Sequence, residues 1–225
     1  MKREIITTAD GSKTIFIPDW DENYHSKHGA LQEALHVFIE AGLKYKCKEQ
    51  SKLSILEIGF GTGLNAMLTY VFGKELNTHI EYHGLEAFPV NAEELTALNY
   101  EKLPFIKDHT ATYEQIHTTK WNALNTIEDT FKLNKIEQEL QTYQPEKAFF
   151  DLIYFDAFGP RVQNEMWSLP IFEKLFASLK QGGVLVTYCA KGQVKRDLKS
   201  AGFSIESIPG PPGKREMTRA VKLIR

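Results

Sequence analysis

The fold is decided by one stretch of the chain, LSILEIGFGTGLNAMLTYV (residues 53–71). Its first six residues form a short, mainly apolar run, which is typical of a buried strand. Gly59, Gly61 and Gly63 follow at alternate positions, and a helical run begins at Leu64. Glycines after a strand let the backbone approach a ligand, and the next helix offers free N–H groups and the positive end of its dipole. The stretch therefore predicts a strand, a nucleotide-binding loop and a helix.

The same alternation of strands and helices continues toward the C-terminus. The pattern predicts strands at 80–85, 152–155 and 184–188 and helices at 90–99, 134–142 and 169–179. Strands separated by helices favour a mostly parallel sheet. The apolar runs 203–208 and 217–224 are instead joined by a short Pro/Gly loop, so we expect the last strand to be antiparallel.

Upstream of the deciding stretch, the chain predicts a separate extension. Two β-prone runs, 5–7 and 13–17, flank a turn-rich tetrapeptide and predict a hairpin, and apolar residues at helical spacing predict a helix at 29–43. We expect residues 1–50 to form an extension packed on the core and residues 51–225 to form a Rossmann-like domain.

Composition narrows the class of protein. A chain of 225 residues with 42% hydrophobic residues and a net charge of −2 suits one globular domain and argues against nucleic-acid binding by bulk charge. The two cysteines and seven histidines form no metal-ligand spacing, and no apolar run reaches the roughly 20 residues that span a bilayer. The first residues lack the apolar run of a secretory signal. We expect a cytoplasmic protein without metal.

The residues around the glycine loop distinguish between nucleotide ligands. A triphosphate-binding loop is disfavoured because no Lys-Ser/Thr pair follows the last glycine, whereas Gly61-x-Gly63-x-x-Ala66 satisfies the dinucleotide fingerprint. Glu57, just before the loop, favours S-adenosylmethionine, because a carboxylate there can receive the cationic methionine end. Glu86, after the second strand, can accept hydrogen bonds from both ribose hydroxyls. With an antiparallel last strand, these features favour the class I methyltransferase fold.

A carboxylate also marks the opposite end of the predicted pocket. The strand at 152–155 is followed by Asp156-Ala157-Phe158-Gly159-Pro160, and ligands of open α/β sheets bind beyond such strand ends. Asp156 can accept a hydrogen bond from a substrate amine, orient its lone pair and take its proton. We therefore expect Asp156 to be catalytic.

An ordered set of motifs gives the chain a family resemblance. The set consists of Glu57-Ile58-Gly59-Phe60-Gly61-Thr62-Gly63-Leu64-Asn65, Asp156-Ala157-Phe158-Gly159-Pro160, Asn164-Glu165-Met166-Trp167, Gly182-Gly183, Gly202-Phe203 and Gly213-Lys214-Arg215-Glu216-Met217. Upstream, Tyr24-His25-Ser26 with Gly29 and Glu33 also fits. The chain resembles the methyltransferase domain of the MnmC type, which stands alone in some bacteria as MnmD.

The resemblance implies a reaction and a set of site residues. The reaction is methylation, with S-adenosylmethionine, of the exocyclic amine of 5-aminomethyl-2-thiouridine at the tRNA wobble position. Cofactor contacts are implied for Glu57, Gly59, Phe60, Gly61, Gly63, Asn65 and Glu86, and substrate contacts for Tyr24, Phe158, Pro160, Trp167, Lys214 and Arg215. Fused relatives add a flavin oxidase domain, which we do not expect here, so no flavin is expected.

The charge is unevenly distributed along the chain. Residues 186–225 contain nine basic and three acidic residues, a balance of +6, which leaves −8 on the rest. Clustered cations can attract a phosphate backbone, and Lys214 and Arg215 are the predicted contacts for a tRNA anticodon loop. Phe158 and Trp167 are the predicted platforms on which bases stack.

The sequence leaves two other interpretations of the function open. A small-molecule N-methyltransferase or a spermidine-synthase-like aminopropyl transferase would share the acids at the strand ends but would need no basic tail. A nucleotide-binding module without catalysis would need only the glycine loop.

Overall fold

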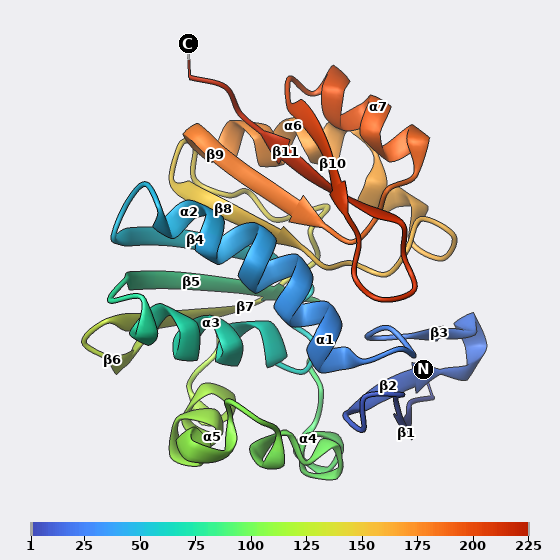
Figure 1. Ribbon diagram of the computed structural model, residues 1–225, viewed down its shortest axis with the longest axis vertical. Helices are drawn as coiled ribbons and strands as arrows, with labels where there is room; N and C mark the ends of the chain where they lie inside the picture. Colours follow the sequence, from blue (N-terminus) through green and yellow to red (C-terminus); the bar gives the residue numbers. More distant parts are fainter. Residues whose placement is uncertain (1, 225) are drawn as a thin grey trace.

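An eight-stranded sheet forms the centre of the computed structural model, which describes residues 2–224 (Figure 1). Its order is β10-β11-β9-β8-β4-β5-β7-β6. The strands are β4 (Lys52–Ile58), β5 (His79–Glu86), β6 (Leu124–Glu128), β7 (Phe131–Glu137), β8 (Phe150–Phe155), β9 (Leu179–Thr187), β10 (Ser204–Pro209) and β11 (Glu216–Val221). The five strands from β9 to β7 are parallel, whereas β11 is antiparallel to β9 and to β10. The predicted parallel sheet with an antiparallel last strand is confirmed.

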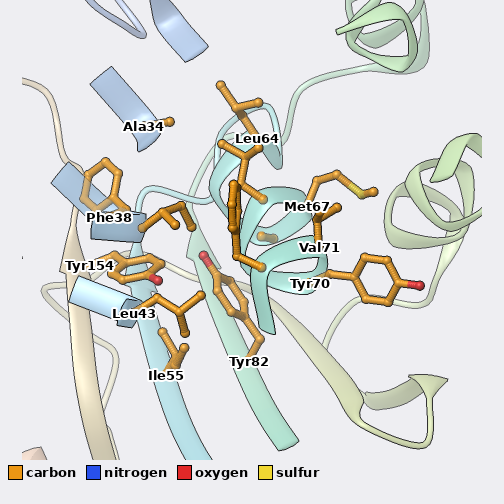
Figure 2. Packing of buried hydrophobic residues seen from close by; sticks show 14 of the residues in the cluster. Ala34, Phe38, Leu43, Ile55, Leu64, Met67, Tyr70, Val71, Tyr82 and Tyr154 are labelled. Atoms are coloured by element: carbon orange, nitrogen blue, oxygen red, sulfur yellow. The ribbon is translucent and has the colours of Figure 1, made fainter. Parts of the chain in front are cut away.

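Helices cover both faces of this sheet. On one face lie a continuous helix made of α1 (Ala30–Ala34), the π-helical η2 (Leu35–Leu43) and α2 (Lys44–Cys47), together with α3 (Leu64–Glu75). Figure 2 shows Phe38 and Leu43 of this helix beside Tyr154 and Ile55 of the sheet. On the other face lie α6 (Leu169–Ser178) and α7 (Gly192–Ser200). The remaining helices are η1 (Pro18–Trp20), α4 (Ala92–Leu98), η3 (Tyr100–Lys102), η4 (Lys107–His109), α5 (Thr110–Thr118) and η5 (Asn164–Trp167).

One predicted element is wrong: the segment 134–142 is not a helix. Its first residues belong to β7, which pairs in parallel with β5 in the register Gly84↔Lys135. Buried positions alternate along β7, as they do in a strand, but one of them is the lysine Lys135. Its ammonium donates to the His117 carbonyl at 2.7 Å and lies 5.0 Å from the Trp121 ring centre. Because a charged side chain is counted as exposed in a sequence pattern, Lys135 interrupts the alternation of apolar and polar residues that would have predicted a strand.

A second, three-stranded sheet lies at the N-terminus. It is formed by β1 (Glu4–Thr7), β2 (Lys13–Ile17) and β3 (Glu22–Asn23), and the first two make the predicted hairpin. Arg3 donates to the Phe88 carbonyl at 2.7 Å and pairs with Glu94 at 3.1 Å. Arg161, from the loop after β8, donates to the Trp20 carbonyl at 2.7 Å and pairs with Glu22 at 3.0 Å. These contacts fix the small sheet over the carboxyl ends of the central strands.

Candidate active site

The candidate site is a cavity at the carboxyl ends of β4, β5, β8 and β9. Its volume is about 1020 Å³, and its walls include the N-terminal sheet and the loop between β10 and β11. Small-molecule sites usually have volumes of about 300–1,000 Å³, so this cavity can take a cofactor and part of a second reactant. Its position agrees with the rule that open α/β sheets bind ligands beyond the carboxyl ends of their strands.

The glycine loop forms the floor of one end of the cavity. The N–H groups of Gly59 and Phe60 both donate to the Leu85 carbonyl at 3.0 Å, which ties the loop to β5. Gly59 has φ +88°, and a Cβ at this position would lie 2.7 Å from the Asp156 carbonyl oxygen. Only glycine satisfies both conditions without strain. The predicted strand, loop and helix are therefore confirmed, and the loop lies directly against the end of β8.

Glu86 presents its carboxylate at this same end. One oxygen accepts the Gly61 N–H at 2.9 Å, and the other accepts the Phe88 N–H at 2.9 Å. Each carboxylate oxygen has about two acceptor positions, so each can still accept one hydroxyl. This arrangement suits the two neighbouring hydroxyls of a ribose.

A hydrogen-bonded chain connects the buried acid Glu57 to Asp156 on the cavity wall. The Asn65 amide nitrogen donates to Glu57 Oε1 at 2.8 Å and to Asp156 Oδ2 at 2.9 Å. Tyr82 OH donates to Glu57 Oε2 at 2.8 Å. Asn65 Oδ1 is buried and has no hydrogen-bond partner among residues 2–224. It is thus an acceptor that a bound ligand could satisfy.

Burial shifts the acidity of both carboxyl groups. Desolvation raises the pKa of Glu57 to about 8, although the Asn65 and Tyr82 hydrogen bonds oppose the shift. Burial also raises the pKa of Asp156 well above its usual range, and the nearby Glu33 and Glu57 carboxylates add to the effect. Buried acids of this kind respond strongly to an added positive charge, because such a charge favours the ionised form.

The predicted cofactor residues occupy two layers. Gly59, Phe60, Gly61, Asn65 and Glu86 are on the cavity wall, whereas Glu57 and Gly63 lie behind it. Glu57 is fully buried and meets the cavity wall through Asn65. The Phe60 ring lies edge-on to Trp121 with centroids 6.0 Å apart, so it also packs in the core.

An aromatic group forms the opposite end of the cavity, around the loop after β8. The Phe158 ring lies edge-on to Trp20 and Tyr24, with centroids 5.2 and 5.0 Å apart. Phe158, Pro160 and Tyr24 line the cavity beside Asp156, as their predicted role requires.

Trp167 does not have the role expected of it. It is only 3% exposed, and its indole N–H donates to the Phe158 carbonyl at 2.7 Å. Its ring packs on Phe155 with centroids 4.7 Å apart. The expectation of a stacking platform at Trp167 is wrong, because η5 turns the ring into the core, where it supports the loop that carries Phe158.

The C-terminal cations also differ from the expectation of a cluster that attracts a phosphate backbone. Lys195 pairs with Glu216 at 2.9 Å and Arg219 with Glu206 at 2.7 Å, so part of the local excess charge is neutralised. Lys214 pairs with the buried Glu33 at 2.6 Å and faces the cavity. Lys214 is therefore not held as a phosphate contact, whereas its neighbour Arg215 lines the mouth of the cavity.

The sequence patterns gave no chemical role to several residues of the wall. Glu33 is implied only by the family resemblance, and no sequence motif marks Tyr188, Phe88 or Lys191 as a site residue. Tyr188 and Lys191 come from the segment after β9, which carries no recognisable motif. The position of Tyr188 and Lys191 after a central strand could have identified them, because residues that follow central strands lie at the edge of the sheet where ligands bind.

Residues 2–224 contain neither a cluster of metal-ligating side chains nor a membrane-spanning helix. Across that range, no three histidine, cysteine, aspartate or glutamate side chains are placed to hold a metal ion. No helix in the same range is long and apolar enough to cross a membrane.

Comparison with known sequences finds both a family and individual relatives. Residues 100–223 match a family described as S-adenosyl-L-methionine-dependent methyltransferase. The chain is 31% identical, over 96% of its length, to the tRNA 5-methylaminomethyl-2-thiouridine biosynthesis bifunctional protein MnmC of Cupriavidus necator. The chain spans about a third of the length of such relatives, 34% in this case.

Comparison with solved structures confirms the predicted class I fold. The structure of MNMC2 from Aquifex aeolicus matches 97% of this chain and 70% of its own, with a TM-score of 0.78 and 26% identity. Spermidine synthase from Thermotoga maritima matches 99% of this chain and 74% of its own, with a TM-score of 0.55 and 10% identity. At that identity, the likeness to the synthase concerns the fold alone.

Proposed function

The chain belongs to the family of S-adenosyl-L-methionine-dependent methyltransferases, and we propose that it methylates the exocyclic amine of 5-aminomethyl-2-thiouridine at the wobble position of tRNA. The observation that carries the proposal is Asp156, a half-buried carboxylate beside the glycine loop, on the wall of a cavity large enough for cofactor and nucleoside. The names of the MnmC relatives support the choice of tRNA.

The residues present fit S-adenosylmethionine. Glu86 is oriented to accept hydrogen bonds from the ribose hydroxyls, and Gly59 allows close approach of the backbone. The Asn65 Oδ1, which has no partner among residues 2–224, can accept a hydrogen bond from an ammonium group. When bound, the cofactor supplies a methyl group on a cationic sulfur that needs no further activation by the protein.

The protein has two tasks in this reaction. It must hold the amine in line with the methyl group, which the Phe158 loop and the N-terminal sheet can do from two sides. It must also leave the nitrogen lone pair free, for which Asp156 accepts a proton from the amine. The raised pKa of Asp156 makes this carboxylate a better proton acceptor than an exposed one.

The anticodon loop is the part of tRNA that must reach the cavity, because the wobble base lies in it. Lys191 and Arg215 line the mouth and can contact its phosphates. Phe158 offers an aromatic ring for an unstacked base. We place the reaction in the cytoplasm, where tRNA is modified and where free thiols such as Cys47 and Cys189 persist.

The decisive experiment is mass analysis of nucleosides after incubation with S-adenosylmethionine. The substrate is tRNA that carries a free aminomethyl group at the wobble uridine, and the control is the same tRNA with plain 2-thiouridine. We expect a gain of one methyl group on the aminomethyl nucleoside and no change in the control. A methylated or aminopropylated polyamine with unchanged tRNA would support the small-molecule reading and overturn this one.

A further inference from the structure

One primary ammonium group is already held inside the cavity, and it belongs to the protein. Lys214 Nζ lies 2.6 Å from Glu33 Oε1 and 3.9 Å from the centre of the Tyr188 ring. A carboxylate and an aromatic face are the two groups that bind ammonium ions best in a partly buried site. Glu33, Tyr188 and Lys214 all line the cavity, together with Asp156.

The groups that hold this ammonium are fixed without its help. The second oxygen of Glu33 accepts the Ser26 N–H at 2.8 Å, and the Glu33 residue is only 7% exposed. Tyr188 OH donates to the Ala157 carbonyl at 2.8 Å, which fixes the ring next to the end of β8. The receptor for the ammonium would therefore keep its shape if Lys214 moved away.

Lys214 itself is placed so that it can leave. Its side chain is 35% exposed, and it lies in the loop Gly210-Pro211-Pro212-Gly213 to Arg215, between β10 and β11. The base of this loop is held by the contact of His36 Nε2 with the Pro209 carbonyl at 2.8 Å. Gly213 has φ +84° and packs so closely on His28 that a Cβ would overlap the ring. Arg215, the next residue, is exposed and also lines the cavity, so the partly exposed Lys214 side chain has solvent beside it into which it can rotate.

We propose that Glu33 and Tyr188 form the receptor for the primary amine of the substrate, and that Lys214 occupies this receptor until the substrate displaces it. This inference rests on the proposed function and names the part of the site that selects an amine. The displaced ammonium of Lys214 then lies beside Arg215, on the side where the tRNA phosphates approach.

The exchange explains how the site would distinguish an amine from other groups. If Lys214 leaves, Glu33 is a buried carboxylate without a cation, which is strongly unfavourable. An incoming ammonium restores the pair, whereas a hydroxymethyl or unsubstituted uridine leaves the charge unpaired. Specificity then comes from a penalty against the wrong substrate as well as from attraction to the right one.

The bound ammonium must lose one proton before it can react. In the proposed order, the substrate ammonium enters beside Glu33 and passes one proton to the Asp156 carboxylate. The nitrogen uses the freed electron pair to form the bond to the methyl carbon, the carbon–sulfur bond breaks, and its electrons stay on sulfur. Glu33 keeps its charge throughout and stabilises the methylammonium product.

The test compares the affinities of two tRNAs in the presence of S-adenosylhomocysteine, which prevents turnover. One tRNA carries aminomethyl-2-thiouridine and the other carries 2-thiouridine, and the ratio of their dissociation constants measures the preference for the amine. We expect Glu33→Gln to reduce this ratio to within twofold of unity, and Lys214→Met to raise it at least fivefold. Arg215→Ala is the matched control, and it should weaken binding of both tRNAs by the same factor.

A small probe makes the test independent of tRNA. Butylammonium titrated into the Lys214→Met protein should bind at least fivefold more tightly than to the wild type. In the double variant Lys214→Met/Glu33→Gln, this gain in affinity should be lost. Butanol serves as the uncharged control. Equal butylammonium affinity in the wild type and in Lys214→Met would overturn the inference, as would an amine preference that survives Glu33→Gln. If the tRNA is not methylated but the butylammonium result holds, only the proposed substrate is wrong.

Discussion

The two ends of the cavity are built in different ways. At the proposed cofactor end, the glycine loop and Asn65 come from residues 57–65, and Glu86 is the last residue of the neighbouring strand β5. At the proposed amine end, the Glu33–Lys214 pair joins residues 181 positions apart, and Asp156 and Tyr188 come from two further segments. The cofactor end is thus largely local in sequence, whereas the amine end is assembled by the topology.

The difference between the two ends indicates where substitutions can change substrate specificity. A loop held by backbone hydrogen bonds to the next strand tolerates few changes, because its glycines have neither space nor conformational freedom for side chains. The amine end depends on single side chains carried by separate loops. We expect substitutions at the two ends to separate cofactor binding from turnover and substrate choice.

The largest effect should come from Asp156→Ala at the amine end. Loss of the proton acceptor should lower kcat by about 10²–10⁴-fold, the usual contribution of a general base. The affinity for S-adenosylhomocysteine should change little, because Glu86 and the glycine loop stay in place. Single-turnover kinetics together with calorimetric titration of the cofactor product measure both quantities.

Asp151→Asn is the matched control for this experiment. Asp156 directly follows strand β8, and Asp151 lies near the other end of that strand, where it accepts the Ser54 N–H and pairs with Lys180 at 2.8 Å. We expect a lower melting temperature and an unchanged kcat. A wild-type kcat in Asp156→Ala would remove Asp156 from the chemistry.

A smaller effect is expected from Glu86→Gln at the cofactor end. Charge-assisted hydrogen bonds contribute about 1.5–3 kcal/mol, so the affinity for S-adenosylhomocysteine should fall by roughly 10–100-fold. Binding of tRNA without cofactor should be unaffected. Glu81→Gln is the control on the same strand β5, because Glu81 pairs with His83 away from the cavity. Equal loss of cofactor affinity in both variants would contradict the assignment of Glu86.

A third effect, on stability rather than on binding or turnover, concerns the bridge of Glu57 and Asn65 that connects the two ends. The pKa of Glu57 is about 8 in the folded protein, above its ordinary value of 4.5. As pH rises from 4.5 to 8, the unfolded chain has lost this proton while the folded one keeps it, so the free energy of unfolding falls. At most about 1.4 kcal/mol is lost per pH unit.

Glu57→Gln removes this dependence. Its melting temperature should fall less between pH 5 and pH 8 than that of the wild type, by several degrees for a chain of this size. Differential scanning fluorimetry without ligand measures the difference. Parallel pH profiles for the two proteins would show that Glu57 is ionised in the folded state.

The sequence was sufficient for the elements whose signals are local. The strand, loop and helix around Gly59, the end of β8 at Asp156 and the antiparallel β11 follow from periodicity, glycines and loop length. The segment 134–142 was misassigned because Lys135 is a charged residue in a core position. Its ammonium lies over the Trp121 ring and donates to the His117 carbonyl, and no pattern in the sequence indicates these partners.

Local sequence signals are enough to predict the glycine-loop end of the cavity, because a buried strand, three glycines and two acids lie between residues 53 and 86 and interact through the backbone of neighbouring strands. The partners of the remaining charges follow from the fold instead. In the folded protein, Trp167 packs in the core and does not offer a stacking surface. Lys214, which was expected to contact phosphate, pairs with the Glu33 carboxylate. A side chain pairs with a group that lies near it in the folded protein. For Lys214 that group is the Glu33 carboxylate, 181 positions earlier in the sequence, and no local pattern can indicate such a pair.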